Sequence, residues 1–334
     1  MQAVDQEVLT QVRDWLAAGT TCWLCTIVET YGSSPRPVGS LLACNSAGAV
    51  VGSLSRGCVE DDLLVKLRAG ELVDDAPRLL EYGLAPEDTE KLGLPCGGSL
   101  NVVVEPLEAN HATLFQRIVE RLEARGCIRR EVRLAKGDAM RVTEQESFEP
   151  LSLLQSTREP PLLRHTYGPR RQLFLIGAGM VSRYLAEMAQ ALDYQVTVCD
   201  PRPEMLAAWS VSGVRTICAM PDDAVRAHAD DANSAIIALT HDPRIDDMGL
   251  MEALYSRAYY VGAMGSERTS AKRRQRLAAL DLDQAAIDRL HAPVGLPIGS
   301  KTPPEIAIAI LAELTALQHT ARTAVPEEER IALA

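Results

Sequence analysis

A cysteine stands where a helix is about to begin. In the stretch Leu54-Ser-Arg-Gly-Cys58-Val-Glu60, the thiol follows a glycine and precedes a run of acidic and leucine residues that predicts a helix over 58–69. The free N–H groups and the dipole of a helix N-terminus favour a thiolate, and the neighbouring Arg56 adds positive charge. We therefore predict a ligand-binding thiol at Cys58.

A second cysteine lies in a glycine-flanked loop. In Pro95-Cys96-Gly97-Gly98, the glycine pair lets the backbone approach a ligand closely. Thiolates are soft metal ligands, but no His or Cys partner stands at the spacing of a zinc site. The alternative for both Cys58 and Cys96 is a packed, buried side chain.

Two glycines between a predicted strand and a predicted helix match a dinucleotide-binding pattern. Gly177 allows the tight turn, and Gly179 lets a phosphate reach the helix N-terminus. Ser182 stands where a third glycine is usual, and Asp200 ends the next strand, where an acid can bind a ribose hydroxyl. The alternative is a Rossmann-like domain whose glycines only turn the chain.

Polar residues also follow later strands of this pattern. His241 and Asp242 come directly after an apolar run, at the edge where doubly wound sheets bind ligands; an Asp-Pro turn capped by Asp242 is the alternative. Gly299 lies in GLPIGSKT, which lacks the spacing of a P-loop. Thr302 and Glu305 predict a capped helix start, whose N–H groups would also suit an anion.

One stretch of the chain is strongly positive. We interpret it as the solvated face of a helix, and an anionic ligand or an acidic partner protein is the alternative. Its members are Arg268, Lys272, Arg273, Arg274 and Arg276.

The elements that would position these residues follow from apolar periodicity. Helical spacing over 4–16, ended by Gly19, predicts a first helix. Cys22 and Cys25 match C-x-x-C, but on a strand they would point to opposite faces, so we expect both to pack in the core. The strands expected in the first part of the chain cover 22–30, 40–45, 49–55, 78–84 and 98–106.

Strands and helices alternate after residue 169. Runs such as LFLI and AIIAL are apolar throughout, which suits parallel strands buried on both faces. The predicted fold class is α/β, with an N-terminal mixed α+β domain followed by a C-terminal doubly wound parallel-sheet domain of Rossmann-like type. The expected parts are 1–107 for the first domain with its cysteine loops, 108–168 for a connecting segment, 169–320 for the Rossmann-like domain and 321–334 for a tail.

Composition excludes several classes of protein. The net charge of −11 argues against nucleic-acid binding, and no apolar stretch approaches the roughly 20 residues of a membrane helix. The amphipathic N-terminus lacks the pattern of a signal peptide, so we expect a cytoplasmic protein. Eight cysteines without regular spacing do not form a disulfide framework.

Several long stretches in this order resemble the XdhC/CoxI family of accessory proteins for molybdenum enzymes. The resemblance spans nearly the whole chain apart from 108–168 and the tail. It is carried by GSSPRPVGSLL, RGCVEDDLL and PCGGSL, followed by LIGAGMVSRYLAEMAQAL, LTHDPRIDD, YYVGAMGSERTSAKRRQRL and HAPVGLPIGSKTPPEIAIAILAEL.

The resemblance implies a chaperone without turnover of its own. Such a protein binds molybdenum cofactor, as molybdopterin or its cytidine dinucleotide form, and protects its sulfurated state. It would deliver the cofactor to xanthine dehydrogenase or a related molybdenum hydroxylase. A cysteine desulfurase is the other implied partner, and a homodimer is the implied assembly.

The family's motifs also imply site residues. Cys58 and Glu60 fall on a glycine-glycine-cysteine-x-glutamate motif, in which Arg56 replaces the first glycine and cannot allow the same backbone approach. The loop of Cys96, Gly97 and Gly98 falls on the family's cysteine-glycine-glycine motif. Both cysteines are thereby implied as molybdenum contacts, and Arg36 in GSSPRPVGSLL is a further cofactor-binding candidate.

Two other functions stay open at this point. The set of Gly177, Gly179 and Asp200 would suit an NAD(P)-dependent oxidoreductase. The basic stretch would suit an adapter that only docks proteins.

Overall fold

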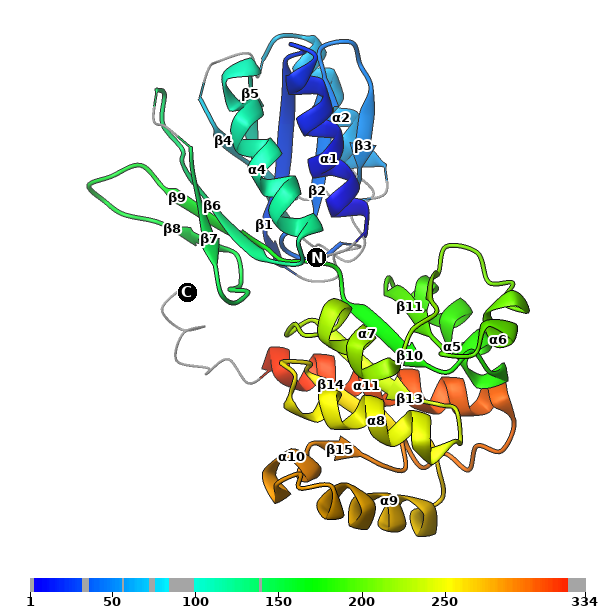
Figure 1. Cartoon of the computed structure of the whole chain (residues 1–334). Helices are drawn as coiled ribbons and strands as arrows, with labels where there is room; N and C mark the ends of the chain where they lie inside the picture. Colours follow the sequence, from blue (N-terminus) through cyan, green and yellow to red (C-terminus); the bar gives the residue numbers. More distant parts are fainter. Residues whose placement is uncertain are drawn as a thin grey trace. The chain divides into compact units, whose positions relative to one another are not determined.

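The chain divides into two compact units, Met1–Pro169 and Arg170–Ala334 (Figure 1). The structure is a computed structural model that describes residues 3–31, 36–55, 57–71, 76–83, 99–137 and 140–323, without the side chains of residues 58, 68 and 318–323. Each unit has apolar clusters of its own.

The first unit begins with a helix and an antiparallel sheet. The sheet has the strand order β3-β2-β1-β5-β4. The expected helix ended by Gly19 and the expected strands are confirmed, with small differences at their ends. The elements are α1 (Ala3–Ala17), β1 (Cys22–Tyr31), β2 (Leu41–Asn45), β3 (Val50–Gly52), α2 (Cys58–Arg68), β4 (Arg78–Tyr82) and β5 (Ser99–Leu107).

Strand β1 separates two apolar layers. Cys22 and Leu24 pack on the side of α1, whereas Cys25 and Ile27 pack on the side of α2. This alternation follows from the two-residue period of a strand. The prediction that Cys22 and Cys25 are core residues on opposite faces is confirmed, and both are buried free thiols.

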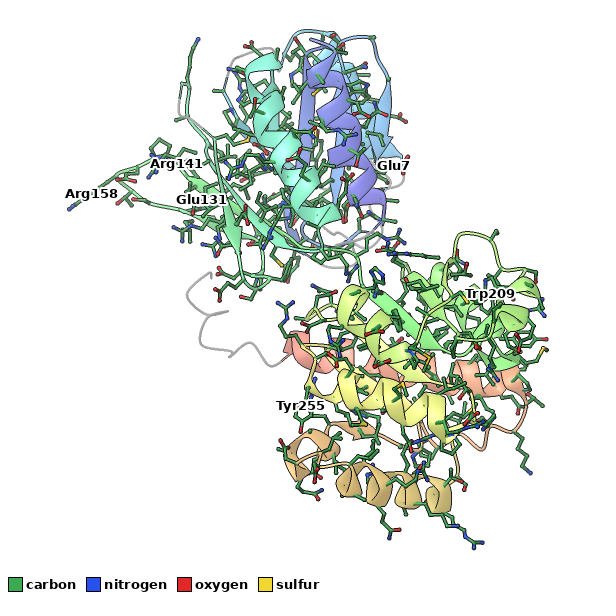
Figure 2. All side chains as sticks on the ribbon, viewed as in Figure 1. Glu7, Glu131, Arg141, Arg158, Trp209 and Tyr255 are labelled. Carbon is green, nitrogen blue, oxygen red and sulfur yellow. The ribbon has the colours of Figure 1, made fainter. Side chains whose placement is uncertain are left out.

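Residues 109–167 fold into a helix and a second antiparallel sheet, of order β7-β6-β9-β8. Helical spacing over 114–124 and the strand-like run over 127–135 predict α4 and β6, whereas the sequence does not predict the other three strands. They are short, and polar residues such as Arg141 occupy their outer face (Figure 2), so apolar alternation is weak. The elements are η2 (Ala109–His111), α4 (Ala112–Glu123), β6 (Cys127–Arg133), β7 (Arg141–Gln145), β8 (Ser152–Leu154) and β9 (Leu162–Tyr167).

A buried ion pair joins the two sheets of this unit. The Arg130 guanidinium of β6 donates to both carboxylate oxygens of Glu105 on β5, at 2.5 and 2.9 Å, and its Nε donates to the Tyr167 hydroxyl at 3.0 Å. His165 stacks on Tyr167 with ring centroids 4.3 Å apart. Burial, together with the nearby Arg130 charge, lowers the pKa of His165 well below its usual value, so the imidazole is neutral.

The second unit is a doubly wound sheet, as predicted. All six strands are parallel in the order β12-β11-β10-β13-β14-β15. Helices α5 and α11 cover one face, and α7 to α10 cover the other. The strands are β10 (Gln172–Ile176), β11 (Gln195–Cys199), β12 (Arg215–Ile217), β13 (Ser234–Ala238), β14 (Tyr260–Ala263) and β15 (Leu290–His291). The helices are α5 (Met180–Ala191), α6 (Pro203–Ala207), α7 (Pro221–His228), α8 (Pro243–Tyr255), α9 (Glu267–Ala279), α10 (Gln284–Asp288) and α11 (Pro303–Thr323).

Three of the five basic residues of α9 do not lie on a solvated face of the helix. Arg273 is buried and binds Asp246 at 2.9 Å, while Arg276 binds Asp247 at 2.6 Å. Arg274 donates to the carbonyl oxygens of residues 290 and 292. The expectation of a solvated face is wrong for these three arginines because they bind acceptors on α8 and beside β15. Arg268 and Lys272 are exposed, as expected.

We expect Glu105→Gln to lower the free energy of unfolding of the first unit by about 3–5 kcal/mol, because the buried Arg130 charge loses its anionic partner. Scanning calorimetry of the full chain measures the transition. The control is Glu159→Gln, whose exposed pair with Arg133 should contribute no more than about 1 kcal/mol. Equal effects of the two variants would contradict a stabilising role for the buried pair.

Candidate functional site

The predicted thiol lies at a helix start. Cys58 is the first residue of α2, and Gly57 before it is the N-cap. Gly57 has a φ of 149°, in the region that favours glycine, and a Cβ added to it would meet no atom of the described residues within 4 Å. Arg56 lies outside the described residues.

The carboxylate of Glu60 binds the turn that precedes α2. Oε1 accepts hydrogen bonds from the Ser53 hydroxyl at 2.9 Å and from the backbone N–H groups of residues 54 and 55, both at 2.8 Å. Oε2 accepts from the Gly57 N–H at 3.0 Å and from the Ser55 hydroxyl. Both oxygens of Glu60 are thus used inside the turn.

These hydrogen bonds keep Glu60 ionised. Burial raises the pKa of the carboxyl group, but the bonds from the Ser55 hydroxyl and from the backbone outweigh it and lower the pKa to about 2. A group with this arrangement organises the backbone around Cys58. The sequence motif predicts that Glu60 belongs to the site, but not that its donors lie on the preceding turn.

The strand register of the first sheet places the strand ends next to the loops of Arg36, Cys58 and Cys96 at one end of the sheet. Strand β1 ends at Tyr31, which pairs with Ser99 directly after the Cys96-Gly97-Gly98 loop. The loop that carries Arg36 joins the same end of β1 to β2, and β3 leaves the sheet toward Cys58 beside Leu42. Residues 96–98 themselves lie outside the described part of the chain.

Arg36 is placed beside the first helix. Its Nη2 lies 3.5 Å from Oδ1 of the buried Asp5, which also accepts the Leu41 N–H at 3.1 Å. Asp5 therefore holds the end of the Arg36 loop to α1. The sequence contains no pattern that pairs these residues.

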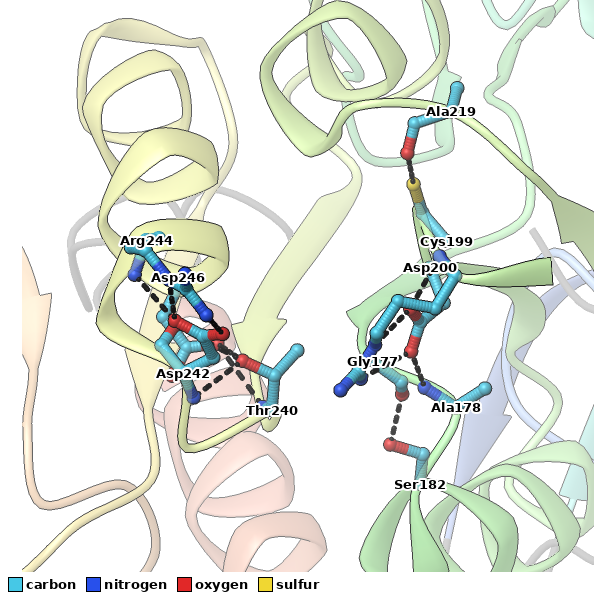
Figure 3. A network of polar contacts seen from close by, with 11 residues as sticks. Gly177, Ala178, Ser182, Cys199, Asp200, Ala219, Thr240, Asp242, Arg244 and Asp246 are labelled. Carbon is cyan, nitrogen blue, oxygen red and sulfur yellow. Dashed lines mark hydrogen bonds and ion pairs between the residues drawn. The ribbon is translucent and has the colours of Figure 1, made fainter. Parts of the chain in front are cut away.

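The glycine loop of the second unit forms the expected tight turn. Gly177 has a φ of 103°, and a Cβ on it would come within 2.6 Å of the Thr240 side chain, so only glycine fits against the neighbouring strand. Ser182, in place of a third glycine, is buried and donates to the Gly177 carbonyl at 2.6 Å (Figure 3). Gly179 is the N-cap of α5. This loop lies where the strand order reverses between β10 and β13, the usual ligand position in such sheets.

Asp200 is buried and already has hydrogen-bond donors. It accepts the Ala178 N–H at 2.9 Å and three donors of Arg202 at 2.8 to 3.0 Å. Burial raises the pKa of this carboxyl group, but the Arg202 and Ala178 hydrogen bonds outweigh it and lower the pKa. A ribose hydroxyl would have to replace an Arg202 donor. Arg202, two residues after the acid, was not among the sequence candidates.

Thr240 and Asp242 lie on the loop that faces Gly177 (Figure 3), and His241 stands between them in the chain. Asp242 caps α8 by accepting the Arg244 N–H at 2.9 Å, as the capping alternative expects, and hydrogen bonds from Arg244 lower its pKa to about 2. His241 is exposed, with a positive φ of 65°. Thr240 donates to Asp246 at 2.7 Å, which links this loop to the buried Arg273.

The loop of Gly299 leads into a capped helix. Glu305 accepts the N–H groups of Lys301 and Thr302 at 2.8 and 2.9 Å, so the predicted helix start is confirmed. Gly299 has a φ of 79° and open space at its Cβ position.

Two negative findings apply only to the described residues. Among them, no three His, Cys, Asp or Glu side chains form a group that could hold a metal ion. Likewise, none of their helices is long and apolar enough to cross a membrane.

Comparisons with known proteins agree with this architecture. Residues 15–83 match the model of the XdhC and CoxI family, and residues 173–314 match that of the XdhC Rossmann domain. The chain is 27% identical to a probable xanthine dehydrogenase subunit from Bacillus subtilis, over 90% of this chain and 94% of that protein. It is 25% identical to the molybdenum cofactor insertion chaperone PaoD from Escherichia coli, over 91% of this chain and 85% of that protein.

A solved structure extends the similarity to the whole chain. The crystal structure of a protein described as a xanthine dehydrogenase from Bacillus halodurans superposes with a TM-score of 0.72 at 25% identity. The match covers 95% of this chain and 98% of that one. With both family models matched in order and relatives similar over nearly their full length, the chain belongs to the XdhC and CoxI family.

Proposed function

We propose that this chain is an accessory chaperone that binds molybdenum cofactor as its cargo and supports its insertion into xanthine dehydrogenase or a related molybdoenzyme. The names of the relatives from Bacillus subtilis and Escherichia coli support this role. The proposal includes protection of the sulfurated cofactor, sulfur supply by a cysteine desulfurase, and a homodimeric assembly.

The observation that carries the proposal is the glycine–cysteine turn at the start of α2. Molybdenum cofactor combines an anionic phosphate with a soft metal centre, and the turn offers matching groups. The N-terminus of α2 favours an anion, and Cys58, a residue with a soft thiol group, is the first residue of this helix. The Cys96 loop, which ends beside β1 at the same end of the sheet, is the proposed second contact.

Glu60 acts in this proposal as a positioning residue. Its oxygens bind the turn, so they orient the backbone that presents Cys58 and need not touch the cofactor. The ionised carboxylate keeps this geometry at neutral pH.

Replacing the thiol tests the site directly. We expect Cys58→Ala to reduce the cofactor retained per chain about tenfold, equivalent to about 1.4 kcal/mol of binding free energy. The measurement incubates purified protein with molybdenum cofactor, removes free ligand and quantifies the oxidised pterin by fluorescence. Cys218→Ala is the matched control, because Cys218 is an exposed free cysteine of the second unit. Equal retention by the two variants would remove the thiol from the site.

A second pair of variants tests the role of Glu60. Both Glu60→Gln and Asp61→Asn remove one negative charge from the first turn of α2, but Asp61 is exposed. We expect only Glu60→Gln to reduce cofactor retention, since it loses the contacts to the turn. If Asp61→Asn has the same effect, charge at the helix start matters and positioning does not.

The contribution of Glu60 to stability should depend on pH. The folded-state pKa of Glu60 is lowered from 4.5 to about 2, so its contribution to stability is present above pH 4.5 and declines as the pH falls toward 2. The stability difference between wild type and Glu60→Gln should therefore shrink over this interval. Thermal unfolding as a function of pH measures it, and a constant difference would contradict the assigned pKa.

Nicotinamide nucleotides are the alternative ligands, through the glycine loop of the second unit. Because Arg202 occupies the Asp200 carboxylate, we expect no NAD⁺ binding at millimolar concentration in a calorimetric titration. Submillimolar NAD⁺ binding that is lost in Asp200→Asn would favour the oxidoreductase instead.

A further inference from the structure

Four arginines surround one glutamate on the outer face of the second sheet of the first unit. Glu131 of β6 pairs with Arg141 of β7 on one side and with Arg164 of β9 on the other. Arg129 and Arg133 lie two residues before and after Glu131, on the same face of β6. We define these four arginines and Glu131 as the arginine face.

Strand alternation directs this face away from the core of its unit. Ile128, Arg130 and Val132 of β6 are buried on the inner side, against α4 and the first sheet. The intervening residues of β6 are half-exposed, and Arg141 on the edge strand is exposed. The loop that carries Phe148 covers the Cys127 end of this face, where Thr166 is also buried, so the more exposed part of the face consists of Arg133, Arg141 and Arg164.

The arginine face is only weakly neutralised by the chain itself. Arg164 binds the central Glu131 at 2.8 Å. Arg129 and Arg133 pair with Glu149 and Glu159 on flanking loops, whose side chains are 55% and 63% exposed. The Arg133–Glu159 pair, in which both side chains are exposed, contributes at most about 1 kcal/mol, so a partner's carboxylate could replace Glu159.

Arg141 forms no ion pair with a carboxylate of the described residues. The described residues offer it no ion-pair partner within 4 Å, although it stands opposite Glu131 across the sheet. Because Glu131 already binds Arg164, the guanidinium group of Arg141 can bind a carboxylate of another protein. Arginine is suited to this role because its planar group binds carboxylates bidentately and is enriched at protein interfaces.

Local charge complementarity identifies the occupant. The face and its rim hold four arginines against three glutamates, so positive charge is in excess there, and a cationic patch attracts acidic surfaces. The patch has an acid at its centre and two at its rim, which favours discrete carboxylates over a continuous phosphate backbone. The basic helix α9 is a weaker candidate, because three of its five cations bind acceptors within the second unit.

We propose that the arginine face docks an acidic surface of the molybdoenzyme that receives the cofactor. This inference rests on the proposed function for the identity of the partner. In the complex, the partner's carboxylates replace Glu159 at Arg133 and bind Arg141.

A charge reversal at Arg141 tests this docking. The experiment measures the affinity of the full chain for purified molybdoenzyme freed of its cofactor, by biolayer interferometry at low and moderate salt. We expect Arg141→Glu to weaken the affinity at least about tenfold at low salt and to reduce its salt dependence. Arg141→Lys, which keeps the charge but loses the bidentate geometry, should weaken the affinity less than Arg141→Glu and keep the salt dependence of the wild type.

A matched reversal on the other unit is the control. Arg268→Glu changes the charge by the same amount at an exposed position of α9 and should leave the affinity unchanged. Unfolding temperatures of all variants exclude a folding defect.

Four results would overturn the proposal. The first is that the wild-type chain does not bind the molybdoenzyme, and the second is that Arg141→Glu binds it as tightly as the wild type. The third is that only Arg268→Glu loses affinity for the enzyme, and the fourth is that Arg141→Glu keeps its affinity for the enzyme but loses self-association or binding of single-stranded RNA. Cofactor retention by the isolated chain separates these results from a failure of the proposed function. Arg141→Glu should retain the cofactor as the wild type does, whereas Cys58→Ala should not.

Discussion

Carboxylates that bind backbone N–H groups ahead of helices organise the candidate sites of this chain. The first N–H groups of a helix have no partner within the helix, and a turn before it adds further donors. Glu60 binds the donors before α2, Asp200 binds the Ala178 N–H in the loop before α5, and Glu305 binds those before α11. These hydrogen bonds hold the described backbone around each helix start. At the proposed cofactor site, Glu60 therefore supplies part of the order that binding an anion requires.

The sequence predicts the elements with a strong period and the helix starts with a capping pattern. The all-apolar strands of the second unit and the Thr302–Glu305 cap are confirmed, as is the start of α2 at Cys58. The strands β7 to β9 are not predicted. Strands β7 and β8 are short and have no buried position, and a buried position of β9 carries His165, so the alternation of apolar and polar residues that marks a half-buried strand is lost.

Charged residues explain why the candidate surfaces are harder to predict than the fold. Arg273 belongs to a basic run that predicts a solvated side chain, yet it is buried and paired with Asp246 and Asp247 of α8. The arginine face shows the converse, because its members are scattered over three strands and meet only through strand pairing. The spacing of basic residues along the sequence therefore does not predict where the basic surface of the folded chain lies. The partners of Glu60 are different, because they are close in sequence but are recognisable only once the turn is formed.

The buried ion pair of the first unit connects the two proposed surfaces of the chaperone. Strand β5 begins directly after the Cys96 loop, and its Glu105 holds Arg130 of β6. The neighbours of Arg130 on β6 are Arg129 and Glu131, which point to the arginine face. Because a buried, bidentate pair fixes both strands, the cofactor loops and the docking face share one framework. A chaperone that must present its cargo to a bound enzyme needs this relation, since a docking face on an independently moving segment would not orient the cofactor.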